Sequence, residues 1–112
     1  MPRIRNRTSV QAHIDRMVQR IVRKFHPEQI ILFGSHARGE AGPDSDIDLL
    51  VVMSVAKSVR ETRLEISLAL PDFPIPVDVI VTTPENFAWR KDIVGTIEWP
   101  ATREGKVLYA RH

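Results

Sequence analysis

Two carboxylates lead directly into the most apolar stretch of this chain. Residues 47–53 read IDLLVVM, a run rich in β-branched side chains that is typical of a strand inside a sheet. Asp46 stands just before this run and Asp48 lies within it. Residues two apart on a strand point to the same side, so both carboxylates face the same way. Because charge beside a buried strand is costly unless it is paired or binds a metal, the two aspartates indicate a functional site.

Two like charges side by side require a cation. Their oxygens suit Mg²⁺, which usually takes one or two carboxylates together with substrate phosphates. A third carboxylate, Asp78, is the lone charge in the run PVDVIV, and strands that are neighbours in sequence often pair. We therefore predict that Asp46, Asp48 and Asp78 converge as catalytic and metal-binding residues. Two metal ions can clamp the oxygens of a phosphoryl transfer, and Asp78 is the candidate to take the proton from an attacking hydroxyl.

A glycine, a serine and an arginine supply the other half of such a site. Gly34 and Ser35 close the short apolar run QIILF at residues 29–33. If a helix begins here, its free N–H groups and the Ser35 hydroxyl can point at an anion, and Gly34 lets a phosphate approach the backbone. Arg38 would lie on the same side of the first turn. It either neutralises phosphate or fixes the loop by pairing with a carboxylate, and the sequence favours neither role.

Hydrophobic spacing arranges the chain as one α/β unit. We expect helices at residues 9–25, 56–70 and 84–94, and strands at residues 29–33, 47–53 and 76–81. Thr83 is predicted to cap the third of these helices. The segment GKVLYAR is either an edge strand or the end of a docked helix.

Length and composition narrow the class of protein. A chain of 112 residues predicts a single domain over residues 1–112. There is no cysteine, no apolar run long enough for a bilayer and no signal-peptide core, so we expect a cytoplasmic protein without a membrane segment. The formal net charge is only +2 and the basic residues are scattered, so direct nucleic-acid binding is not expected.

These elements together resemble a known family. The run GSHARGEAGPDSDIDLLVV is similar to the signature of the minimal nucleotidyltransferases of the DNA polymerase β superfamily, and PVDVIV resembles their third-carboxylate strand. The resemblance implies an α/β (α+β) nucleotidyltransferase fold, with a small mixed sheet flanked by helices. It also implies a Mg²⁺-dependent transfer of a nucleoside monophosphate, such as AMP from ATP, in which Asp46, Asp48 and Asp78 form the triad and Gly34 and Ser35 hold the triphosphate.

The resemblance also implies a partner. Members of the family often act as the antitoxin of a toxin–antitoxin pair whose toxin is a HEPN-domain ribonuclease, and some attach AMP to a tyrosine of that toxin. The segment REGKVLYAR resembles the closing segment of the family, from which we expect a complete chain. Larger nucleotidyltransferases hold the acceptor with a second domain, so we expect a partner or a second copy to complete the site as a homo- or hetero-oligomer.

Two other functions remain open from the sequence. The chain could be an antitoxin that neutralises its partner by binding alone, or a nucleotidyltransferase for a small molecule such as an aminoglycoside. The roles of three ring side chains are also open. His36 is expected to be a solvated loop residue that has some chance of touching nucleotide, whereas one of Trp89 and Trp99 covers the core and the other belongs to an interface.

Overall fold

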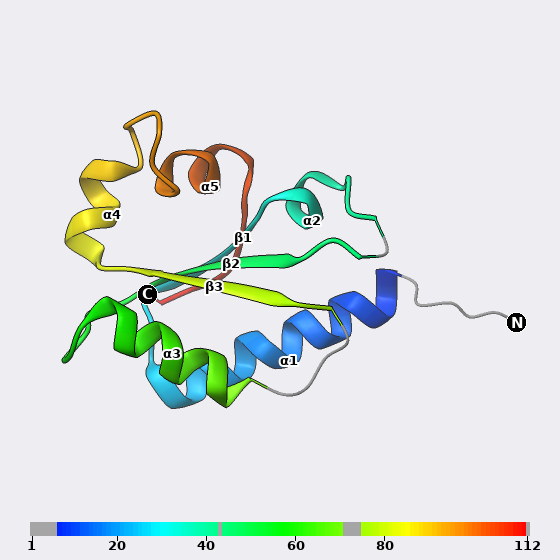
Figure 1. Ribbon diagram of the computed structural model, residues 1–112, viewed down its shortest axis with the longest axis horizontal. Helices are drawn as coiled ribbons and strands as arrows, with labels where there is room; N and C mark the ends of the chain where they lie inside the picture. Colours follow the sequence, from blue (N-terminus) through cyan, green and yellow to red (C-terminus); the bar gives the residue numbers. More distant parts are fainter. Residues whose placement is uncertain (1–6, 43, 71–74, 112) are drawn as a thin grey trace, which may run out of the picture.

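The computed structural model describes residues 7–42, 44–70 and 75–111, and a mixed four-stranded sheet lies at the centre of these residues (Figure 1). Its strands are β1 (Gln29–Phe33), β2 (Ile47–Val52), β3 (Val77–Thr82) and β4 (Lys106–Ala110). Their order is β3-β2-β1-β4. β1 runs antiparallel to both β2 and β4, whereas β2 and β3 are parallel. The predicted fold class is therefore confirmed.

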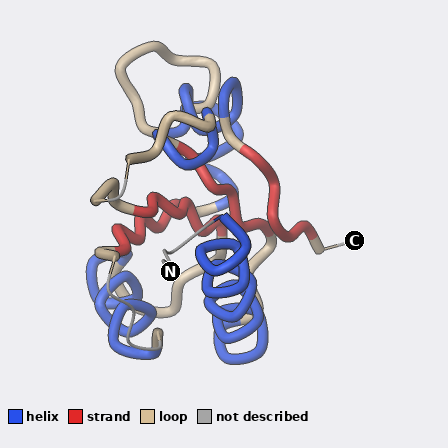
Figure 2. Tube along the Cα trace, turned by 90° about the vertical axis from the view of Figure 1, so that its right-hand side faces the viewer, coloured by secondary structure: helices blue, strands red, loops and turns tan. Residues whose placement is uncertain are grey.

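Helices cover both faces of the sheet (Figure 2). The longer helices α1 (Arg7–Phe25) and α3 (Val59–Ala69) lie on one face, and α4 (Pro84–Arg90) and α5 (Glu98–Glu104) lie on the other (Figure 1). The single-turn helix α2 (Ser35–Arg38) follows the end of β1. Among the described residues, no helix is long and apolar enough to cross a membrane.

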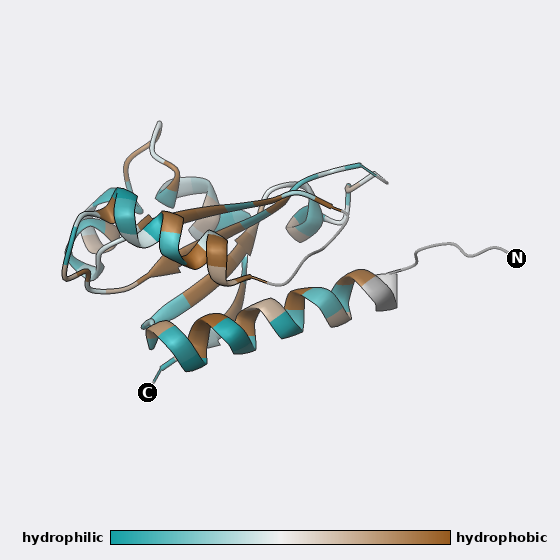
Figure 3. Cartoon of the chain, turned by 60° about the horizontal axis from the view of Figure 1, so that its bottom comes forward, coloured by the Kyte–Doolittle hydropathy of each residue, from teal (hydrophilic) through white to brown (hydrophobic). Residues whose placement is uncertain are grey.

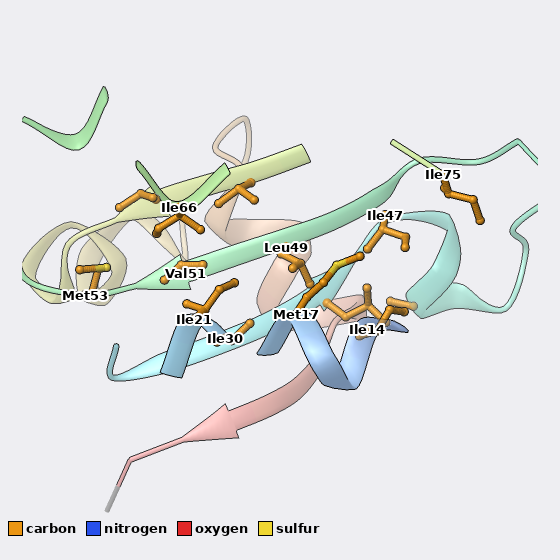
Figure 4. Packing of buried hydrophobic residues seen from close by; sticks show 14 residues of the cluster. Ile14, Met17, Ile21, Ile30, Ile47, Leu49, Val51, Met53, Ile66 and Ile75 are labelled. Atoms are coloured by element: carbon orange, nitrogen blue, oxygen red, sulfur yellow. The ribbon is translucent and has the colours of Figure 1, made fainter. Parts of the chain in front are cut away.

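The main core lies between the sheet and the two longer helices. Ile47, Leu49 and Val51, which are alternate residues of β2, are fully buried there against α1 and α3 (Figure 4). The apolar side of α1 faces the sheet and its hydrophilic side faces away (Figure 3). Because side chains alternate along a strand, Asp48 points to the opposite face.

A smaller core lies on that opposite face. Ile31 and Leu50 are buried against Ala101 of α5, with Phe87 of α4 packed beside them. Asp48 precedes Leu50 on the same face and stays partly exposed. The face of the sheet under α4 and α5 is therefore apolar, and the end of that face at Asp48 is polar.

Most predicted elements are present, with shifted ends. α1 begins two residues before the predicted start, β2 stops one residue earlier and β3 is shifted by one residue. α3 begins at Val59 rather than at residue 56. The reason is a capping box. Ser58 Oγ accepts a hydrogen bond from the Glu61 backbone N–H, and Glu61 Oε1 accepts one from the Ser58 backbone N–H. The segment GKVLYAR is resolved as the edge strand β4.

The region after β3 departs most from the prediction. The cap at Thr83 is confirmed, because its hydroxyl accepts the Asn86 amide at 3.2 Å. The helix it caps ends at Arg90 instead of residue 94. Helix α5 was not predicted at all, since it has little apolar periodicity and carries Pro100 in its first turn, where proline is tolerated.

A buried glutamate fixes α5 in place. Glu98 accepts hydrogen bonds from Thr82 Oγ1 at the end of β3 (2.7 Å) and from Arg90 Nε of α4 (3.1 Å). Burial favours the neutral acid, but these hydrogen bonds and the charge of Arg90 outweigh it and lower the pKa of Glu98. One ionised side chain therefore joins three elements.

The two tryptophans differ in environment. Trp89 on α4 is 56% exposed. Trp99 on α5 is partly buried, with the Arg103 guanidinium 4.6 Å from its ring centroid. The interface predicted for one of them remains a prediction.

Candidate active site

The register of the sheet brings the predicted residues to one end of it. Asp48 lies directly opposite Asp78 in the parallel pair of β2 and β3, which confirms the predicted pairing of these strands. Phe33 lies opposite Asp48 in the antiparallel pair of β1 and β2. Gly34 follows Phe33, so three segments that are distant in sequence meet around Asp48.

Gly34 is in direct contact with the Asp48 side chain. Its backbone has a positive φ of 76° with ψ of −158°, a combination that only glycine adopts readily. A Cβ at this position would stand 2.3 Å from Asp48 Oδ2, far inside van der Waals contact. The missing side chain therefore makes room for a carboxylate of the site itself. The phosphate approach predicted for Gly34 and Ser35 stays a prediction.

His36 holds the loop that leads to the carboxylates. Its Nε2 donates to the Ser45 carbonyl oxygen at 3.0 Å, and its side chain is partly buried. The contact fixes the residue directly before Asp46 against α2. His36 is thus more than a solvated loop residue, and no sequence pattern signals a contact between a side chain and a carbonyl nine residues away.

Arg38 pairs with carboxylates at the surface. Its Nε lies 2.8 Å from Glu40 Oε1, and its Nη1 lies 3.4 Å from Glu104 Oε1. The hydrogen bond to Glu40 is the main reason why the pKa of Arg38 is raised. Of the two predicted roles, the described contacts show carboxylate pairing. The predicted binding of Arg38 to nucleotide phosphate is not tested by these contacts.

Electrostatics couple the three aspartates at Asp48. Partial burial raises the pKa of Asp48, and the negative charges of Asp78 and Asp46 raise it further. The positive charges of His36 and Arg38 oppose this rise. The ionised form of Asp48 is therefore less favourable than that of an isolated aspartate, and a bound cation would offset this difference.

Asp78 has a partner that the sequence did not reveal. Arg63 Nη2 donates to Asp78 Oδ1 at 2.8 Å, and both side chains are about half exposed, at 49% and 47%. Arg63 belongs to α3, on the far side of the sheet from Asp78. The guanidinium reaches around β3, which is an edge strand. The sequence does not indicate this pair, because the contact depends on how the folded chain brings α3 to the edge of β3.

The donor set fits a cation that arrives with phosphate. Among the residues that the structure describes, no three His, Cys, Asp or Glu side chains are grouped closely enough to hold a metal alone. Asp48 and Asp78 are register neighbours, however, and Mg²⁺ commonly needs only one or two carboxylates, with phosphate oxygens and water as its other ligands. Asp46 is exposed, and its part in the triad stays a prediction.

A family model described as "Nucleotidyltransferase domain" matches residues 14–100, which include β1, β2, β3 and the aspartates. The chain belongs to the nucleotidyltransferase domain family. The match ends before β4, so the edge strand lies outside the part that the family model covers.

Three proteins of Methanocaldococcus jannaschii are similar in sequence. This chain is 35% identical over 85 residues to "Putative protein adenylyltransferase MJ0604", and the match covers 73% of this chain and 78% of that protein. Two more proteins with the same description are MJ1305, 41% identical over 61 residues, and MJ0141, 29% identical over 55 residues. These matches cover 53% and 49% of this chain but only 40% and 54% of the two relatives.

Two solved structures share the fold. A protein from Sulfolobus solfataricus described as "a putative nucleotidyltransferase" superposes with a TM-score of 0.61 at 22% identity, covering 96% of this chain and 91% of that chain. A chain from a structure titled "Crystal structure of the toxin-antitoxin with AMP-PNP" gives a TM-score of 0.53 at 20% identity, covering 88% and 74%. At these identities the likeness shows the nucleotidyltransferase fold alone.

Proposed function

We propose that this protein transfers AMP from ATP to a hydroxyl of a partner protein in a Mg²⁺-dependent reaction. The observation that carries the proposal is the β2–β3 register, which sets Asp48 level with Asp78 while Gly34 lies against the Asp48 carboxylate. The names of the three relatives support protein adenylylation as the activity.

The three aspartates, Gly34 and Ser35 then have distinct roles. Asp46 and Asp48 would hold the cation that accompanies the triphosphate, and Asp78 would help to hold a second ion. Bound Mg²⁺ would supply neutralisation of the phosphate charge. Gly34 and Ser35 would present backbone N–H groups and a hydroxyl to the triphosphate.

The proposed transfer is balanced as follows. The acceptor hydroxyl loses its proton to Asp78 while its oxygen forms a bond to the α-phosphorus of ATP. The bond from that phosphorus to the bridging oxygen breaks, and pyrophosphate leaves.

We propose further that the acceptor is a HEPN-type toxin and that this protein is its cytoplasmic antitoxin. The toxin–antitoxin structure with a similar fold supports a partner of this kind. The described residues form one domain around a single sheet, and we propose that the partner completes the site.

The test is transfer of label from ATP labelled at the α-phosphate to the protein encoded by the neighbouring gene. We expect label on the partner in the presence of Mg²⁺, and a loss of about a hundredfold or more in Asp48→Asn and Asp78→Asn, the scale for losing a positioned catalytic group. Asp15→Asn, which removes a carboxylate from α1, should transfer normally.

Undiminished transfer by both variants would contradict the proposed site. Neutralisation of the partner by Asp48→Asn, without any transfer by the unmodified protein, would instead show an antitoxin that acts by binding alone.

A further inference from the structure

The contact between Arg63 and Asp78 is the starting point. Asp78 is the one aspartate of the predicted triad whose carboxylate makes an ion pair with a described arginine or lysine. Arg63 has no second ion-pair partner among the described side chains. It comes from the helix that connects β2 to β3 and reaches around the open edge of β3.

We propose that Arg63 is the counter-ion of Asp78 in the metal-free protein and competes with a divalent cation for that carboxylate. The inference rests on the proposed function, because it takes Asp78 to be a metal ligand. It assigns to Arg63 a positioning role in the site.

The chemistry of the pair supports competition. Asp78 Oδ1 gives a lone pair to the Arg63 N–H, and the positive guanidinium offsets the charge that attracts a cation. Arg63 is about half exposed, so it can leave the carboxylate without losing a buried contact. A cation that binds Asp78 must therefore displace Arg63 or share the carboxylate with it.

The pair also reduces the negative charge around Asp48. Asp78 is the register neighbour of Asp48 across β2 and β3, so the two carboxylates repel each other. With Arg63 beside Asp78, the aspartates repel one another less than they would alone. Removal of Arg63 should leave a more negative site that attracts a cation more strongly.

The experiment measures Mn²⁺ binding without nucleotide, from the electron paramagnetic resonance signal of free Mn²⁺. Arg63→Ala should bind Mn²⁺ about fivefold more tightly than the unmodified protein, which is the upper end of what an exposed ion pair is worth. Arg63→Gln, which keeps much of the side-chain length without the charge, should also bind more tightly and serves if Arg63→Ala fails to fold by circular dichroism.

Arg60→Ala is the matched control. Arg60 lies one turn earlier on α3 and is exposed, and its side chain makes no hydrogen bond or ion pair with another described residue. Arg60→Ala removes one positive charge from α3, as Arg63→Ala does, and should change Mn²⁺ affinity less than twofold.

A double-mutant cycle isolates the pair. In an Asp78→Asn background, adding Arg63→Ala should bring no gain in Mn²⁺ affinity beyond that of Arg60→Ala. Equal or weaker Mn²⁺ binding by Arg63→Ala than by Arg60→Ala in the native background would overturn the inference.

The two proposals fail differently. If Mn²⁺ binding is lost in Asp48→Asn but Arg63→Ala behaves like its control, the metal site stands and only the role of Arg63 is wrong. If neither the unmodified protein nor any variant binds Mn²⁺ without nucleotide, the competition is wrong, whereas the proposed function, in which the cation arrives with ATP, is decided by the transfer assay.

Discussion

Gly34 and Gly39 both have a positive φ but differ in ψ and in environment. They flank α2 with φ of 76° and 75°, while ψ is −158° at Gly34 and 20°, the left-handed helical value, at Gly39. A Cβ at Gly34 would collide with Asp48 Oδ2, whereas a Cβ at Gly39 would meet nothing within 4 Å. A side chain at Gly39 therefore meets only the cost of a left-handed helical backbone, whereas one at Gly34 meets a backbone conformation that is essentially restricted to glycine and must also displace a carboxylate.

We predict that Gly39→Ala lowers the free energy of unfolding by about 1 kcal/mol, because alanine adopts this conformation less readily. Gly34→Ala should lower it by a further 1–3 kcal/mol or so, the scale of overpacking, and should also weaken binding of Mg²⁺ with ATP. Urea unfolding and calorimetric titration of both variants give the comparison. Equal effects on unfolding and on binding would mean that the Asp48 carboxylate moves aside freely.

Some contacts of individual residues follow from local rules and others do not. The meeting of Asp48 and Asp78 could be predicted because strand alternation and pairing of sequential strands are local regularities. The partners of His36 and Arg63 could not, since a loop closure and a path around a strand edge decide them. Arg38 lies between predictable and unpredictable contacts, because the sequence allowed its pairing with a carboxylate as one of two roles.

The elements after β3 show why α5 escaped prediction. Helices with a regular apolar stripe, such as α1, are visible in sequence, and so are helices with strong caps, such as α3 and α4. α5 is short, and its buried residues are only Ala101, which packs in the smaller core, and Glu98, which joins it to β3 and α4. A polar anchor of this kind becomes recognisable only when Thr82 and Arg90 are placed around it.

Glu98 should make stability depend on pH. Its folded pKa is lowered, so its contribution is fully present above the ordinary pKa of a glutamate and is lost as the pH falls through the folded value. We predict that Glu98→Gln is less stable than the unmodified protein at pH 7 by on the order of 1–3 kcal/mol, as for a buried charge-assisted hydrogen bond. The difference should shrink toward acid pH in thermal unfolding.

Thr82→Val tests the same prediction from the donor side. It removes the hydrogen bond to Glu98 Oε2 but keeps the carboxylate and its contact with Arg90. Because this hydrogen bond helps to lower the pKa of Glu98, the stability difference between Thr82→Val and the unmodified protein should also shrink toward acid pH. A stability gap for Glu98→Gln that stays constant from pH 7 to pH 3 would contradict the ionised state of Glu98.

At the scale of the whole molecule, the two cores share one sheet. Leu49 and Val51 pack toward α1 and α3, while Leu50 between them packs toward α5. Neither face can lose its helices without exposing strand residues that also support the other face. This mutual dependence favours one cooperative unit, as expected for a single domain over residues 1–112.

We therefore predict a single unfolding transition. Trp89 and Trp99 report on α4 and α5, whereas α1 and α3 contribute most of the helical circular dichroism. Urea midpoints from tryptophan fluorescence and from circular dichroism should coincide within error. A fluorescence midpoint at clearly lower urea would show that the α4–α5 layer unfolds alone.

The strand order carries a consequence for the newly made chain. β1 lies between β2 and β4, and its apolar sequence QIILF is paired on both edges only when β4 is in place. β4 is synthesised long after β1, so one edge of β1 stays open while the rest of the chain is being made. An open apolar edge is a template for pairing with another chain. Nascent or truncated forms without residues 106–110 would therefore be those most exposed to aggregation.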